Sequence, residues 1–188
     1  MPINVQYYNG IQKSFANFDE CISYDDGKCS YNTIEFLECR YNKLTSLPNT
    51  LPSLLIALHC DCNNLTSLPE NLPLSLQNLD CENNNLTSLP KISATSLQKL
   101  RCSRNKLTSL PDLPLSLTTL YCSSNKLTLL PDILPPSLKK IDCCNNKLRL
   151  LPHPLPSSLT ILRCYNNKLR ALPKSKYSLL IYHESKDR

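Results

Sequence analysis

Cysteine and histidine are the residues in this chain with the most obvious chemical use. The 188 residues include eleven cysteines and three histidines. His59 and Cys60 are adjacent and suggest a Cys–His nucleophile, but neighbouring strand residues point to opposite faces, so these side chains cannot meet. Cys62 and Cys144 are expected nearer the surface, yet no histidine and carboxylate set recurs around them at metal-ligand spacing. We therefore predict no catalytic residue, no metal and no cofactor, and the protein is not expected to be an enzyme.

Seven of the cysteines occupy one column of a repeat. They are 21 residues apart, except for one step of 20 between Cys102 and Cys122. The column consists of Cys39, Cys60, Cys81, Cys102, Cys122, Cys143 and Cys164. Each stands where the repeat would carry a leucine, which predicts buried, reduced thiols. Neighbouring strands lie about 4.8 Å apart and disulfides span similar Cα separations, so oxidation of some pairs stays open as an alternative.

The elements that position these cysteines follow from the repeat Leu-x-x-Leu-x-Cys-x-x-Asn-x-Leu-x-x-Leu-Pro. Leu100-Arg101-Cys102 and its equivalents alternate apolar and polar residues, as in a strand with one buried face. The return segment is too short and too rich in proline for a helix, so an extended, polyproline-like path is expected. A period of 20 to 21 residues is typical of leucine-rich repeats. The predicted fold class is a leucine-rich-repeat solenoid with a curved parallel β-sheet on the concave side, an extended convex side and few helices.

An asparagine follows each cysteine by three positions. Its amide is predicted to satisfy backbone groups of its own turn and of the next repeat, where the chain leaves the sheet. The predicted structural ladder is Asn42, Asn63, Asn84, Asn105, Asn125, Asn146 and Asn167.

The chain divides into one repeat array and two ends. Residues 34–176 are predicted to hold seven repeats of 20 to 21 residues, and residues 177–188 a capping strand and a tail. Residues 1–33 do not fit the repeat and are predicted to cap its open apolar end, with a signalling or docking helix as the alternative. Four apolar residues would share one face of a short helix here: Ile11, Phe15, Phe18 and Ile22.

The repeat LPxxLxxLxCxxNxLTSLP resembles the short bacterial-type leucine-rich repeat of type III secretion effectors from enteric pathogens. Its cysteine column, with only two glycines in the chain, is more similar to leucine-rich-repeat proteins of giant DNA viruses of amoebae. The resemblance implies a protein-interaction scaffold, and a viral protein acting in a host cell if the second similarity holds. Some such effectors carry a ubiquitin-ligase domain with a Cys-x-Asp sequence. This chain contains no Cys-x-Asp, so that activity is not implied.

Outward positions beside the cysteines vary between repeats while the inward positions stay the same, as expected of a binding scaffold. The predicted concave residues for a protein partner are Phe36, His59, Lys99, Arg101, Tyr121, Lys140, Ile161, Arg163 and Tyr165. The alternative is that charged residues of this surface only pair across strands, for a few tenths of a kcal/mol each. The pairs would be Arg40 with Asp61, Asp80 with Arg101, and Asp142 with Arg163.

Charge is divided unevenly along the chain. Residues 1–96 hold 5 Lys/Arg and 10 Asp/Glu, net −5, whereas residues 97–188 hold 16 and 5, net +11, which sum to +6. The alternative function is therefore nucleic-acid or anionic-surface binding through the basic half, although lysines that only keep an edge soluble would look the same. Opposite ends of opposite charge also predict a monomer or weak end-to-end self-association.

Two absences bear on location. No apolar run is long enough to predict a membrane span. The amino terminus MPINVQYYNG lacks the basic start and apolar core of a signal peptide. We expect a cytoplasmic protein, in the host cytoplasm if it is viral.

Overall fold

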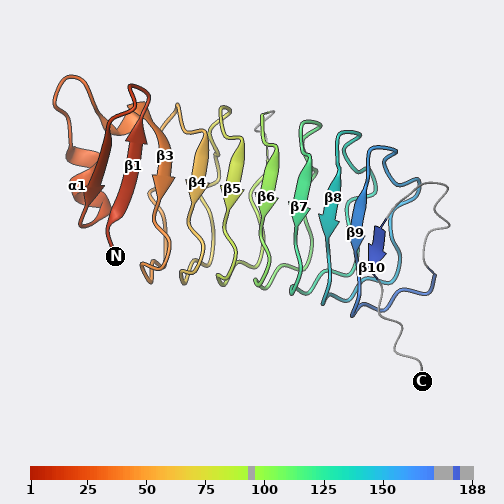
Figure 1. The fold of residues 1–188 in the computed structure, drawn as a ribbon. Coiled ribbons are helices and arrows are strands. Elements are labelled where there is room, and N and C mark those ends of the chain that lie inside the picture. Colours follow the sequence, from red (N-terminus) through yellow and green to blue (C-terminus); the bar gives the residue numbers. More distant parts are fainter. Residues whose placement is uncertain (93–95, 172–179, 183–188) are drawn as a thin grey trace.

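The structure is a computed structural model that describes residues 1–92, 96–171 and the backbone of 180–182. One ten-stranded sheet runs through it in the order β10-β9-β8-β7-β6-β5-β4-β3-β1-β2 (Figure 1). The strands are β1 (Ile3–Tyr7), β2 (Gln12–Phe15), β3 (Ile34–Glu38), β4 (Ala57–His59), β5 (Asn78–Asp80), β6 (Lys99–Arg101), β7 (Thr119–Tyr121), β8 (Lys140–Asp142), β9 (Ile161–Arg163) and β10 (Leu180–Tyr182). Two short helices precede β3: α1 (Phe18–Ser23) and the 3-10 helix η1 (Tyr31–Thr33).

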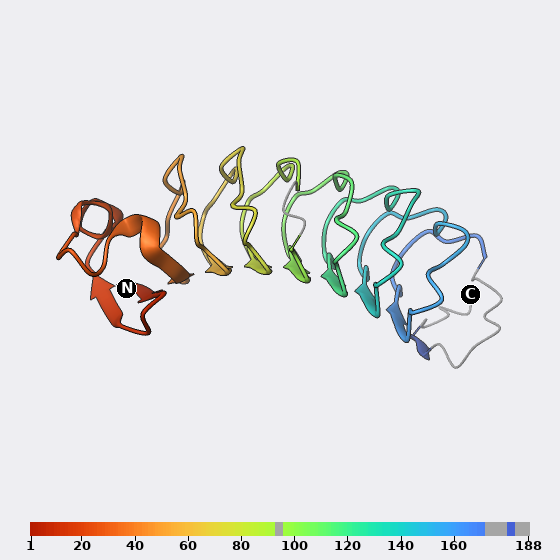
Figure 2. The ribbon, with the colours of Figure 1, turned by 90° about the horizontal axis from the view of Figure 1, so that it is seen from above.

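Strands β3 to β9 belong to the seven cysteine-centred repeats, which we number as units 1 to 7. They pair in parallel with equivalent residues opposite each other, as in Leu58 with Leu79 and Leu79 with Leu100. The sheet lines the inner side of an arc, and the extended return segments form its outer side (Figure 2). Within residues 34–92 and 96–171 no helix interrupts these returns. The predicted solenoid with a concave parallel sheet and an extended convex side is confirmed.

The core is a stack of leucine and cysteine side chains. All seven cysteines of the column are 0 % exposed, and all eleven cysteines of the chain are free thiols. Some thiols bond the next unit, since Cys60 Sγ donates to Asp80 O at 3.4 Å. Burial raises the pKa of Cys39 to about 12, and it raises the pKa of Cys60 well above its ordinary value. These thiols therefore stay protonated and unreactive near neutral pH.

The asparagine amides tie each turn to the unit before it. Asn105 Nδ2 donates to Cys102 O at 3.2 Å in its own turn and to Cys81 O at 3.0 Å in the preceding unit. Its Oδ1 accepts the Leu86 N–H at 2.9 Å. The prediction that the amide reaches the next repeat was wrong in direction, because the side chain extends toward the unit already stacked against its turn. Asn42 has no preceding unit and instead donates to Pro2 O, at 3.4 Å.

The amino-terminal region continues the sheet, and its short helix α1 is confined to Phe18–Ser23, whereas the predicted short helix extended from Ile11 to Ile22. β1 pairs antiparallel with both β3 and β2, and Gly10, at φ 83°, forms the turn between β1 and β2. The predicted helical face was wrong, because the hairpin takes Phe15 into a strand and leaves Ile11 and Ile22 exposed by 41 % and 45 %. Backbone pairing decides this, since the free edge of β3 has N–H and C=O groups that a packed helix would leave unsatisfied.

At the other end, β10 pairs in parallel with β9. The remaining residues of the predicted capping strand and tail, 177–179 and 183–188, lie outside the described residues, as do the last residues of the predicted array, 172–176. Among the described residues, no helix is long and apolar enough to cross a membrane.

Candidate functional site

The concave surface is formed by the outward side chains of the sheet. Alternation along each strand buries the central leucine and turns its two neighbours outward, as Lys99 and Arg101 flank the fully buried Leu100. All nine predicted partner-binding residues are at least partly exposed. The sheet therefore presents them in neighbouring positions, and three hollows lie along it.

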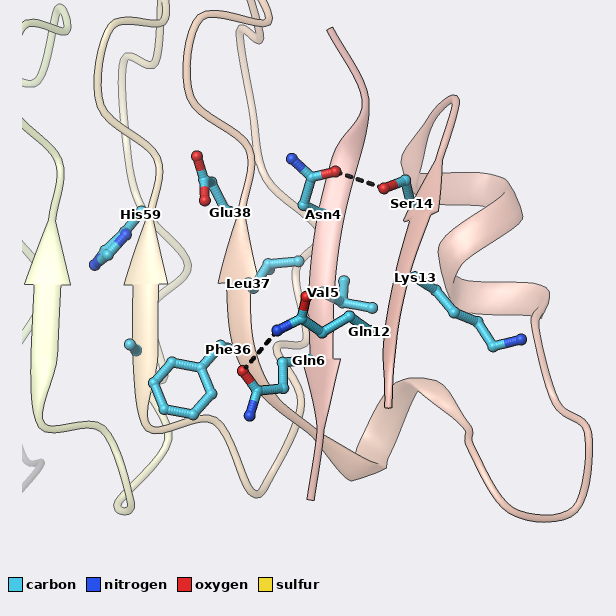
Figure 3. A pocket seen from close by; sticks show the side chains of 11 residues that line it. Asn4, Val5, Gln6, Gln12, Lys13, Ser14, Phe36, Leu37, Glu38 and His59 are labelled. Carbon is cyan, nitrogen blue, oxygen red and sulfur yellow. Dashed lines mark hydrogen bonds between the residues drawn. The ribbon is translucent and has the colours of Figure 1, made fainter. Parts of the chain in front are cut away.

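The first hollow, here called the cap hollow, lies where the cap joins unit 1 (Figure 3). Its volume is about 470 Å³, and its apolar part includes Phe36, 39 % exposed, and Ala57. Polar side chains from four strands surround these residues: Asn4, Gln6, Gln12, Ser14, Glu38 and His59. An aromatic ring beside several amides can accept an apolar side chain while bonding the backbone of the segment that carries it.

The amides of the cap hollow are already ordered by one another. Ser14 Oγ donates to Asn4 Oδ1 at 2.7 Å, and Gln12 Nε2 donates to Gln6 Oε1 at 3.5 Å (Figure 3). Sequence reasoning missed these four residues because it assigned part of the cap to a helix. The signal was present in Ile3–Tyr7, INVQY, where apolar and polar residues alternate as in a strand.

Two smaller hollows continue along the sheet. The middle hollow, about 220 Å³, is lined by Arg40, His59, Asn78, Leu79, Asp80, Lys99 and Arg101. The rim hollow, about 370 Å³, is lined by Tyr41, Asp61, Cys62, Glu82, Asn83, Ser103, Arg104, Tyr121, Ser123 and Asp142. His59 lines both the cap hollow and the middle hollow, so these two adjoin.

Several rim residues have strained backbone. The residue two positions after each column cysteine has a positive φ, and in the rim hollow these include Tyr41 at 57° and Arg104 at 54°. Asparagine tolerates this conformation better than a bulky residue does. Strain of this kind is often retained where a side chain is needed for binding, so these two residues join the candidate site.

The three predicted cross-strand ion pairs are present. Arg40 Nε lies 3.4 Å from Asp61 Oδ1 and 3.3 Å from Glu38 Oε1. Arg101 Nη1 lies 3.7 Å from Asp80 Oδ2, and its guanidinium carbon lies 5.3 Å from the centre of the Tyr121 ring. Arg163 Nη1 lies 3.9 Å from Asp142 Oδ2. These contacts orient Arg101 and Tyr121, and at such exposure they contribute little to stability.

The middle of the surface carries charges of both signs, with Asp80 beside Arg40, Lys99 and Arg101. Burial raises the pKa of Asp80 even though Arg101 lies beside it, and burial also raises the pKa of Glu82. Among residues 1–92 and 96–171, no cluster of His, Cys, Asp and Glu could hold a metal ion.

The repeat is matched by known family models and structures. A model described as Leucine Rich repeats (2 copies) matches residues 74–115, and one described as Leucine Rich Repeat matches residues 116–136. No curated protein matches the sequence.

Solved structures that resemble this chain include the following three. The leucine-rich-repeat domain of a Shigella effector is 33 % identical, with 84 % of this chain and 69 % of that chain covered and a TM-score of 0.70. YopM, a leucine-rich effector protein from Yersinia pestis, is 40 % identical, with 79 % of this chain and 42 % of that chain covered and a TM-score of 0.72. The functional domain of InlJ from Listeria monocytogenes, which includes a cysteine ladder, is 32 % identical. The match covers 86 % of this chain and 36 % of that chain, with a TM-score of 0.74.

This chain spans less than half of the YopM and InlJ chains. The similarity to giant-virus proteins stays a prediction. The repeat models and the Shigella domain, at 33 % identity over 69 % of its length, show that this chain belongs to the leucine-rich-repeat family and that its repeats are of the bacterial type.

Proposed function

We propose that the concave surface binds a protein partner through the cap hollow and the two hollows that follow it. Leucine-rich-repeat domains generally mediate protein–protein interaction, and the similar structures include bacterial effectors. The observation that carries the proposal is the cap hollow, where the exposed Phe36 ring lies among ordered amides. An apolar side chain of the partner occupies this hollow. Polar and charged groups of the partner lie over the mixed charges in the middle of the sheet.

We infer the cellular location of the protein from the families that its repeat resembles. The protein acts in a cytoplasm, as an accessory to a host-directed process if its origin is viral, and it binds its partner as a monomer or a weak end-to-end assembly. It does so without catalysis, because its side chains are arranged for recognition.

Selection of binders from a library of displayed peptides and small domains tests the proposal, because it requires no identified partner. Binders are measured against the wild type and against Phe36→Ala and Tyr121→Ala. Each substitution removes an aromatic contact, and a weakening of at least ten-fold is expected. Leu74→Ser with Leu115→Ser is the matched control, because these exposed leucines line none of the three hollows. Binders that tolerate both aromatic substitutions would refute the concave site.

The alternative suggested by the sequence, binding of nucleic acid or of an anionic surface through the basic half, involves other residues. The exposed lysines four positions after the column cysteine line none of the three hollows: Lys106, Lys126, Lys147 and Lys168. The two activities are therefore separable by substitution. Binding to a nucleic acid would weaken steeply with added salt.

A further inference from the structure

The repeats differ from one another at two exposed columns after the asparagine. Units 1 to 4 carry Thr-Ser at the sixth and seventh positions after the column cysteine, for example Thr66-Ser67. Units 5 to 7 carry Thr128-Leu129, Arg149-Leu150 and Arg170-Ala171 instead. All seven units expose both positions. The change is therefore one of surface chemistry on an unchanged backbone.

The new leucines are not used by the fold. Leu129 is 55 % exposed and Leu150 is 58 % exposed, and the nearby Ile133 in the turn after unit 5 is 82 % exposed. Serine serves at the same position in units 1 to 4, so folding does not require a leucine there. Leu129 and Leu150 occupy the same column of adjacent units, so unlike a single exposed leucine they form a contiguous apolar strip.

Basic residues share the same edge. Lys147 N–H donates to Leu127 O and Arg170 N–H donates to Arg149 O, so these segments stack side by side from unit to unit. We call the following set the edge patch: Lys126, Leu129, Ile133, Lys147, Arg149, Leu150, Lys168 and Arg170. Asp132 and Asp142 are the acidic residues between Lys126 and Arg170, and none occurs between Cys143 and Ala171. Of the ion pairs among the described residues, none involves a basic residue of the edge patch.

The composition of the edge patch favours a bilayer over a folded partner. Its residues line none of the three hollows, which are formed by other side chains. Protruding leucines need a groove in a protein partner, whereas the headgroup region of a bilayer admits them singly. Lysine and arginine beside them are attracted to anionic headgroups.

We propose that the edge patch docks the protein on an anionic lipid bilayer, with Leu129, Leu150 and Ile133 entering the headgroup region and the flanking cations contacting lipid phosphates and carboxylates. The concave sheet stays available, so this activity stands independently of protein binding there.

Vesicle co-sedimentation of the full chain tests the proposal. Phosphatidylcholine vesicles are compared with vesicles containing about 30 mol% phosphatidylserine, at about 0.1 M salt and at about 0.5 M salt. Binding is expected only with the anionic lipid and mainly at low salt. Arg149→Thr with Arg170→Thr should weaken it roughly 25-fold, since each cation near such a surface contributes roughly five-fold. Leu129→Ser with Leu150→Ser should weaken it roughly ten-fold. These substitutions introduce the residues of units 1 to 4, so the fold is retained.

Matched controls come from other parts of the chain. Lys43→Asn with Lys91→Gln removes the same charge outside the edge patch, and Leu74→Ser with Leu115→Ser removes two other exposed leucines. Neither control should change binding by more than about two-fold.

A spectroscopic variant separates insertion from simple charge attraction. The chain has no tryptophan, so Leu150→Trp introduces a single reporter. Its emission should shift to the blue on anionic vesicles, and that of Leu115→Trp should not, because only the first enters the lipid. Binding to heparin or RNA without binding to anionic vesicles would overturn the proposal. So would equal loss of vesicle binding in the control variants, or an unshifted Leu150→Trp spectrum on bound vesicles.

Discussion

The two halves of this solenoid share one backbone path and one set of inward residues, yet they present opposite surfaces. The cap and units 1 to 4 form the cap hollow and the middle hollow, whereas the rim hollow extends from unit 1 to Asp142 of unit 6. The net negative residues 1–96 end before unit 4, and units 5 to 7 carry the edge patch within the basic residues 97–188. The inward leucine, cysteine and asparagine columns tolerate no such divergence because every unit is buried against its neighbours. The inward residues therefore hold the coil together, whereas the outward residues determine the surface of each half.

The asparagine ladder tests whether the scaffold is the same in both halves, and it should give the largest effect. Asn84 and Asn146 each donate to three backbone carbonyls and accept one N–H, at 2.9 to 3.2 Å. Replacing either with alanine leaves buried groups unsatisfied and should lower the free energy of unfolding by about 3 to 5 kcal/mol. Urea unfolding followed by circular dichroism measures this. If the two variants lose free energies of unfolding that differ by more than about 1 kcal/mol, the scaffold is not the same in both halves.

The cap should respond differently from the units because it contains a polar group that its packing does not satisfy. Tyr7 is 0 % exposed and its hydroxyl has no hydrogen-bond partner among the described residues. Burial raises the pKa of this phenol. Tyr7→Phe should therefore raise the free energy of unfolding by about 1 kcal/mol. Tyr31→Phe is the matched control, because the Tyr31 hydroxyl donates to Thr50 O at 3.2 Å, and its loss should lower stability by about the same amount.

Backbone strain at the rim also varies between units. Tyr41, Cys62 and Arg104 have positive φ and line the rim hollow, as does Asn83, whereas the equivalent residues of units 5 to 7 are Ser124, Asn145 and Asn166. Arg104→Asn should raise stability by about 0.5 to 1 kcal/mol and weaken partner binding. Thermal melting measures the expected gain in stability, and the dissociation constant measures the expected loss of partner binding. A gain in stability with unchanged binding would remove Arg104 from the site.

In the acidic half, ionisation of a half-buried carboxyl should lower the stability of the fold by a small, pH-dependent amount. Burial raises the pKa of Glu82, which means that the folded state prefers the protonated carboxyl. Above the raised pKa the ionised side chain costs stability, and below the pKa of the unfolded chain this cost disappears. Glu82→Gln should therefore be more stable by a few tenths of a kcal/mol at neutral pH, after allowance for solvent screening. The difference from wild type should vanish in acid, as followed by unfolding from pH 7 to pH 3. A constant difference over that range would assign the effect to packing.

The sequence alone predicted the coil because the information for it is local and repeated. One period with fixed inward columns, as in Leu100, Cys102 and Asn105, requires a parallel sheet and stacked turns. It also predicted the outward residues, because alternation along a strand is a local property. The rest depended on which segments become neighbours. Tertiary structure decided that β1 pairs with β3, that the asparagine amide extends to the preceding unit, and that the amides of the cap enclose Phe36. Backbone N–H and C=O groups must be hydrogen-bonded once the chain is packed, and the sequence of a single repeat does not specify which segment supplies their partners.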